Sequence, residues 1–206
     1  MNMKKRIEDI LMSTNRDGMY KLLQHMDAIG FYVAPCSGAH HLAKQGGLAE
    51  HSLNVLEYAE RLGIAWMGAS SYYQSMQNSV IIAALLHDLG KCGDHYKPNY
   101  IANMVKDGRP TKEEPEQKFK QSDTKPFITN PDLLYLPHEV RSIAIAERFI
   151  TLTENEEYAI AMHNGLYGDF RYVISGKETP LYMIIHFADL WASRVVEKEE
   201  SESEDN

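Results

Sequence analysis

The chain has 206 residues, 44% of them hydrophobic, which predicts a single domain with its own hydrophobic core. Two cysteines are too few for a disulfide framework, and no signal peptide or apolar stretch of about 18 residues appears, so we expect a cytoplasmic protein without membrane contact. The formal net charge of −8, without a basic stripe, argues against long nucleic acid as a partner and favours a small molecule.

The predicted elements are helical along most of the chain. Two short amphipathic helices over residues 3–13 and 17–30 precede a loop over residues 34–47. Core helices are expected over residues 48–62, 78–90, 139–150, 154–164 and 180–196. The pattern therefore predicts an all-α helical bundle.

The helix expected over residues 48–62 carries His51 on its apolar side. Leu48, Val55 and Leu62 stand three residues before His51 and four and eleven residues after it, so they share one face of a helix. A lone histidine in such a place is usually a hydrogen-bonded core residue. His51 becomes a candidate metal ligand only together with partners from other segments.

His87 and Asp88 end an apolar run over residues 81–86. Burying an isolated carboxylate is costly unless a cation or a hydrogen-bond network compensates it. An imidazole beside a carboxylate suits a divalent ion such as Mn, Fe, Co, Ni or Zn. Lys91, one turn beyond His87, is placed to contact a substrate phosphate.

Residues 91–137 interrupt the helical pattern with prolines and dense charge. A long loop inside a compact domain is uncommon and is usually functional or mobile. We predict a lid-like insertion here, between the second and third core helices, that caps the substrate. A small hairpin is expected within it, near residues 125–136.

Three further candidate ligands follow the insertion. His138 begins one expected helix, and His163 closes the next, which starts with a capping box at residues 153–156. Asp189 shares an apolar face with Ile185, one turn earlier. Two inward acids and two inward histidines on three predicted helices can converge on one ion: His51, His87, Asp88 and Asp189.

The end of the chain is strongly acidic. Residues 197–206 hold six acids and one lysine. We predict a disordered acidic tail there, beyond a single domain over residues 1–196. The sequence is also compatible with an oligomer.

The candidate ligands occur in the order His51, His87-Asp88, His138, His163 and Asp189. This order resembles that of the HD-domain metal-dependent phosphohydrolases, in the version with extra histidines before the last aspartate. The resemblance covers roughly residues 34–196, and its most specific pieces are GGLAEHSL at residues 46–53 and LHDLGK at residues 86–91. The first piece is similar to small HD phosphohydrolases of phages and bacteria, and to the HD domain of a bacterial 3′→5′ exoribonuclease.

The resemblance implies an HD-type all-α fold and a set of metal ligands. His51, His87, Asp88 and Asp189 would hold one ion, while His138 and His163 would hold a second or contact the phosphate, with Asp88 bridging. The cofactor would be one or two divalent ions (Mn, Fe, Co, Ni, Zn or Mg).

We therefore expect hydrolysis of a phosphate ester or anhydride of a nucleotide by attack of a metal-bound hydroxide. Asp88 and Lys91 are the expected catalytic residues, with Glu139 as a candidate to carry a proton to the leaving group. Two alternatives remain open. One is a phosphodiesterase or 3′→5′ exonuclease acting on short RNA or DNA, and the other is a nucleotide-binding sensor without turnover.

Overall fold

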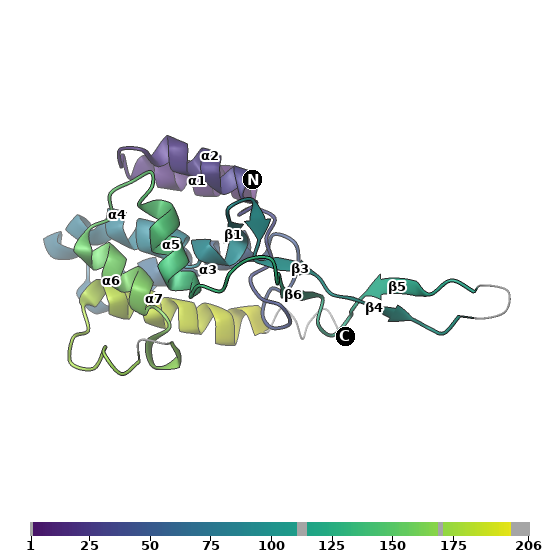
Figure 1. Cartoon of the computed structure of the whole chain (residues 1–206). Helices are drawn as coiled ribbons and strands as arrows, with labels where there is room; N and C mark the ends of the chain where they lie inside the picture. The colour runs from purple at the N-terminus through teal and green to yellow at the C-terminus, as the bar shows by residue number, and fades with distance from the viewer. Residues whose placement is uncertain (1, 111–114, 169–170, 199–206) are drawn as a thin grey trace.

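The computed structural model describes residues 2–110, 115–168 and 171–198, and within them the fold is a helical bundle with a few short strands (Figure 1). The predicted all-α class is confirmed. The helices are α1 (Met3–Ser13), α2 (Met19–Ala28), α3 (Gly47–Met67), α4 (Ser71–Leu86), α5 (His138–Ala146), α6 (Glu154–Met162) and α7 (Pro180–Trp191). Among the described helices, none is both long and apolar enough to span a membrane.

The core of the bundle forms where α3 packs against α4 and α7, and α6 packs against the same two helices. The expected inward face of α3 is confirmed, because Leu48 and Val55 are fully buried. The last turns of α4, residues 82–86, are also fully buried. The residues that directly follow α4 therefore lie in the interior of the protein. Helices α1 and α2 lie together on one side of the bundle (Figure 1).

Two predicted helix boundaries were wrong, each for a physical reason that the structure shows. The sequence suggested that a helix ends at residue 62, before Gly63, but α3 continues to Met67. Gly63 is a packing residue, because a Cβ there would lie 2.1 Å from the ring of Tyr73. The next helix also begins earlier than predicted, at Ser71, where the side chain of Ser70 accepts a hydrogen bond from the Tyr73 amide.

The insertion between α4 and α5 contains three antiparallel strand pairs. They are β1 (Gly93–Asp94) with β2 (Lys97–Pro98), β3 (Tyr100–Ala102) with β6 (Phe127–Thr129), and β4 (Met104–Asp107) with β5 (Lys118–Gln121). Strands β4 and β5 extend away from the helices (Figure 1). The role of residues 91–137 as a lid stays a prediction.

The hairpin predicted near residues 125–136 was wrong. Residues 127–129 form β6, which pairs antiparallel with the earlier strand β3, so that Ile128 lies opposite Ile101. The chain beyond β6 is held elsewhere, because the Asn130 side chain donates to the Pro98 carbonyl at 2.8 Å. This long-range pairing replaces the local turn that the sequence suggested.

Candidate metal centre

His87 and Asp88 stand where α4 ends. The His87 Nδ1 atom lies 2.8 Å from the Ala84 carbonyl, to which it donates a hydrogen bond, so its Nε2 atom carries the lone pair. His87 is fully buried and Asp88 is 1% exposed. A 3₁₀ turn, Leu89–Cys92, follows immediately and turns the chain away.

Gly90 allows this turn to lie directly against α5. A Cβ at Gly90 would lie 2.2 Å from the carbonyl oxygen of His138, closer than any side chain permits. The Gly90 amide donates to the Ser142 hydroxyl at 2.8 Å, and the same hydroxyl lies 2.8 Å from the His87 carbonyl. The LHDLGK sequence therefore fixes Asp88 beside the first turn of α5.

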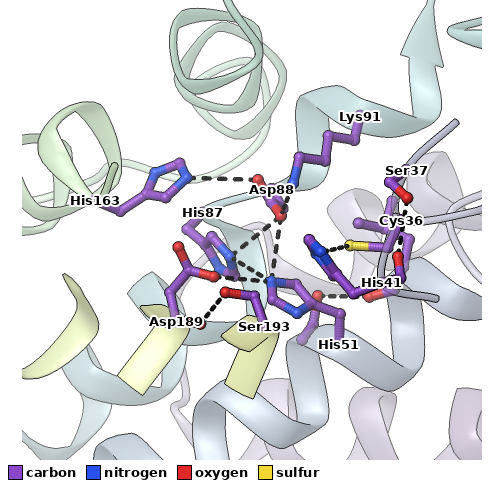
Figure 2. A network of polar contacts seen from close by, with 12 residues as sticks. Cys36, Ser37, His41, His51, His87, Asp88, Lys91, His163, Asp189 and Ser193 are labelled. Carbon is purple, nitrogen blue, oxygen red and sulfur yellow. Dashed lines mark hydrogen bonds and ion pairs between the residues drawn. The ribbon is translucent and has the colours of Figure 1, made fainter. Parts of the chain in front are cut away.

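One group of ligand atoms gathers around the Nε2 atom of His51 (Figure 2). This nitrogen lies 3.4 Å from Asp88 Oδ2, 3.2 Å from Asp189 Oδ1 and 3.3 Å from His87 Nε2. The side chains come from α3, from the end of α4 and from α7. The sequence-predicted first set of ligands is thus brought together.

A second group gathers around the other oxygen of Asp88. Asp88 Oδ1 lies 3.1 Å from His138 Nε2 and 3.5 Å from His163 Nε2, and these two nitrogens are 3.3 Å apart. Asp88 thus faces both groups, one with each oxygen. We call His51, His87, Asp88, His138, His163 and Asp189 the six-residue cluster.

The chemistry of these donors fits a divalent cation. Like His87, two further histidines use Nδ1 for a hydrogen bond. His51 Nδ1 lies 2.9 Å from Glu197 Oε1, and His163 Nδ1 lies 2.7 Å from the Ile160 carbonyl. Imidazoles held at Nδ1 in this way direct their Nε2 atoms at one another and at buried carboxylates. Neither oxygen of Asp88 has a well-aligned hydrogen bond from the described residues. Such an electron-rich mixture of nitrogen and oxygen suits a transition-metal ion.

The electrostatics of the metal-free cluster point the same way. Burial disfavours a charged imidazole at His51, but the nearby Cys36 and the carboxylates of Asp189 and Asp88 outweigh it and hold the pKa of His51 well above 6.5. Burial also opposes charge on Asp88, but the Lys91 ammonium and His87 hold its pKa well below 3.8. The cluster therefore attracts positive charge, either protons or a metal ion.

Competition between protons and metal predicts a pH dependence. Because the pKa of His51 is raised, this imidazole is protonated at neutral pH in the metal-free protein and must release its proton to bind an ion. We expect the affinity for Mn²⁺ to rise about tenfold per pH unit through the neutral range, and to level off above the raised pKa. Titrations of metal-free protein at several pH values measure this, and a pH-independent affinity would contradict it.

Lys91 and Glu139, the other candidate catalytic residues, both lie beside the cluster. The Lys91 ammonium is 2.6 Å from Asp88 Oδ2. Glu139 is buried, with Oε2 located 3.4 Å from His138 Nδ1 and Oε1 2.5 Å from the Asn164 amide nitrogen. This geometry orients His138 through its outer nitrogen. The phosphate contact of Lys91 and proton transfer by Glu139 stay predictions.

Sequence reasoning missed two residues that support the cluster. The Asn164 amide nitrogen lies 3.1 Å from His163 Nε2 and also contacts His138. Glu197 was assigned to a disordered tail, which was wrong for this residue: it is 1% exposed and binds His51. Helix α7 ends at Trp191, and a π-helical turn over Ala192–Val196 leads to Glu197, a change of helix type that the sequence did not signal. Residues 199–206 of the predicted tail lie outside the described residues.

Replacing Glu197 is expected to weaken metal binding without removing a ligand of the cluster. Carboxylates that orient a ligating histidine typically contribute 10–100-fold in affinity. We expect Glu197→Ala to lower Mn²⁺ affinity by about that factor, measured by calorimetric titration. Glu157→Ala, at an exposed glutamate of α6, is the matched control. Equal affinities in the two variants would refute the role of Glu197.

Two cavities meet at the cluster. The larger, about 850 Å³, is lined by Asp189 and His163 together with Lys91, Arg194 and Tyr167. The smaller, about 350 Å³, lies on the side of the insertion and α5, where Lys91, His138, Glu139 and Arg141 line it. The ligand atoms are therefore accessible to small molecules from two sides.

Comparison with known proteins gives one match. A family model described as HD domain matches residues 48–152, just over half of the chain. The matched segment contains His51, His87, Asp88 and His138. No curated protein and no solved structure matches the chain.

Proposed function

Because this chain belongs to the HD-domain family of metal-dependent phosphohydrolases, we propose that it hydrolyses a phosphate ester or anhydride of a nucleotide. The observation that carries the proposal is the position of the six-residue cluster, which opens onto a cavity of about 850 Å³ with cationic side chains at its wall. Cavities of this size accommodate a small organic ligand such as a nucleotide.

The six-residue cluster would hold the ion or ions. His51, His87, Asp88 and Asp189 are the ligands for one position, and Asp88 with His138 and His163 supplies the other. When bound, a divalent ion neutralises phosphoryl charge and lowers the pKa of water towards neutrality. The chain's own contribution is the fixed orientation of the ligands, by hydrogen bonds to the outer nitrogens of the histidines.

Three cationic side chains are placed to bind the phosphates. Lys91 lines both cavities, Arg194 lines the larger one and Arg141 the smaller one. Charge-assisted hydrogen bonds from lysine and arginine are the usual means of holding phosphate. An ammonium that contacts Asp88 in the free protein is close enough to turn to a phosphate bound at the ion.

The wall of the larger cavity also offers a surface for a base. Tyr167 is 73% exposed, and the Arg194 guanidinium lies 5.7 Å from the centre of its ring. An exposed aromatic ring stacks on any nucleobase without reading its identity. We therefore propose a nucleotide substrate with loose base preference.

A substrate panel tests the proposed function. Metal-free protein reconstituted with Mn, Mg, Co, Ni or Zn is assayed for phosphate release from nucleoside mono- and triphosphates, with chelator as the blank. We expect metal-dependent release of phosphate. Shortening of oligonucleotides without release from nucleotides would favour the exonuclease alternative. Nucleotide binding without turnover for any metal would favour the sensor and overturn the proposal.

A further inference from the structure

A second set of ligand atoms lies beside the six-residue cluster and adjoins it at His51, which comes within metal-binding range of Cys36 and His41. Cys36 Sγ is 3.4 Å from His41 Nε2, and His41 Nε2 is 3.8 Å from Glu197 Oε2. Cys36 is fully buried and Glu197 is 1% exposed. We call Cys36, His41 and Glu197 the thiol site (Cys36 and His41 are drawn in Figure 2).

The loop before α3 is shaped to bring Cys36 and His41 together. The Cys36 amide donates to the Leu42 carbonyl at 3.2 Å, and the Ser37 hydroxyl donates to the His41 carbonyl at 2.9 Å. Leu42 adopts a φ of 48°, a left-handed conformation that a leucine rarely takes. The loop therefore maintains a strained conformation in which the thiol and the imidazole face each other.

Only one oxygen of the Glu197 carboxylate accepts hydrogen bonds from the described residues. Its Oε1 atom accepts hydrogen bonds from His51 Nδ1 at 2.9 Å and from the Asn54 amide at 3.1 Å. Its Oε2 atom is buried and accepts no hydrogen bond from the residues that the structure describes. A buried, uncompensated carboxylate oxygen beside a thiol and an imidazole indicates a place for a cation.

We propose that Cys36, His41 and Glu197 bind Zn²⁺ or another thiophilic divalent cation, separately from the six-residue cluster. Tetrahedral zinc with sulfur, nitrogen and oxygen ligands places those atoms about 3.3–3.6 Å apart. The 3.4 Å between Cys36 Sγ and His41 Nε2 and the 3.8 Å between His41 Nε2 and Glu197 Oε2 are close to these values. The thiol proton passes to solvent as the ion binds. His41 and Glu197 line the cavity of about 850 Å³, which gives the ion its route of entry.

The bound ion would join the loop before α3 to the end of the chain's last helical segment. One oxygen of Glu197 would then bind the zinc, while the other oxygen accepts the hydrogen bond from His51. The thiol site therefore sets the position of a residue that orients the cluster, although it supplies no ligand to the cluster. A softer ion is favoured here than at the cluster, because only the thiol site offers sulfur.

Cobalt spectroscopy tests the thiol site directly. Metal-free protein is titrated with Co²⁺, and the near-ultraviolet charge-transfer band of a thiolate bound to cobalt is recorded. We expect the band in the wild type and also in Cys92→Ser. The thiol of the native Cys92 donates a hydrogen bond to the Leu89 carbonyl and is not part of the thiol site. Cys36→Ser should lose the band completely. No band in the wild type, or a band that persists in Cys36→Ser, would overturn the proposal.

Two further variants keep the test independent of folding and of the proposed function. His41→Ala leaves the thiol in place and should weaken the cobalt band's apparent affinity at least tenfold; an unchanged affinity refutes the site. Asp88→Ala disrupts the six-residue cluster and should keep the band. A band lost in Asp88→Ala but not in His41→Ala would assign the thiol to the cluster and reject a separate site.

Discussion

Asp88→Ala is expected to abolish phosphohydrolase activity and Mn²⁺ binding at the six-residue cluster together. Asp88 faces both groups of the six-residue cluster, Oδ2 towards His51 and Oδ1 towards His138. A bound metal ion contributes several kcal/mol to such reactions, and each 1.36 kcal/mol is a factor of ten, so we expect a loss of at least about 1,000-fold. Phosphate release and elemental analysis of the same preparation measure both effects.

Asp94→Asn is the matched control for this variant. Asp94 is also a buried acid on the segment after α4, but both of its oxygens lie 2.9 Å from Arg148, and Asp94 is not part of the cluster. This change is expected to cost stability while metal content and turnover per folded molecule stay normal. If Asp88→Ala retained Mn²⁺, or if Asp94→Asn lost it, the assignment of Asp88 would be wrong.

Removal of the metal is expected to destabilise the whole fold. The cluster joins α3, the end of α4, α5, α6 and α7, and without an ion its buried carboxylates are compensated only by protons and by Lys91. At an ion concentration about 1,000 times the dissociation constant, binding stabilises the folded state by about 4 kcal/mol. For a chain of this size, that corresponds to a fall in Tm of roughly 10 °C after chelation.

Calorimetry of the protein with and without chelator tests this, with re-addition of Mn²⁺ as the check of reversibility. With Mn²⁺ as the only added ion, Asp88→Ala provides the internal control, because chelator should then leave its Tm unchanged. An equal loss of Tm in the variant would mean that the chelated ion lies elsewhere.

The cluster was predictable because its ligands end or interrupt apolar patterns. His51 lies in the buried stripe of α3, and Asp88 follows the last turns of α4, residues 82–86, which are fully buried. Such positions reveal inward-facing polar groups from sequence alone. The order of the six residues then pointed to the HD-domain family, which the match over residues 48–152 confirms.

The supporting residues were harder to predict because their neighbours conceal them. Glu197 stands at the start of an acidic run, where composition favours a solvated tail, yet its carboxylate is buried against His51. Asn164 follows His163 directly and has no apolar pattern around it. Polar residues that act by contacting other polar residues leave no periodic signal in the sequence.

The strands of the insertion were missed for a related reason. They have two to four residues each, too few to show the alternation of a longer strand. Their pairing is also nested, because β3 is separated from β6 by β4 and β5. Non-local pairing of this kind depends on the fold around it, here on the turn after α4 and on Asn130.

The central claim is that the six-residue cluster binds at least one divalent ion, and anomalous diffraction from crystals grown with Mn²⁺ tests it most directly. The account predicts a peak within coordination distance of Asp88 Oδ2, bounded by His51, His87 and Asp189. A second peak at Oδ1 would show that His138 and His163 bind an ion of their own. Density for manganese only at other places, or no peak at saturating Mn²⁺, would contradict the account.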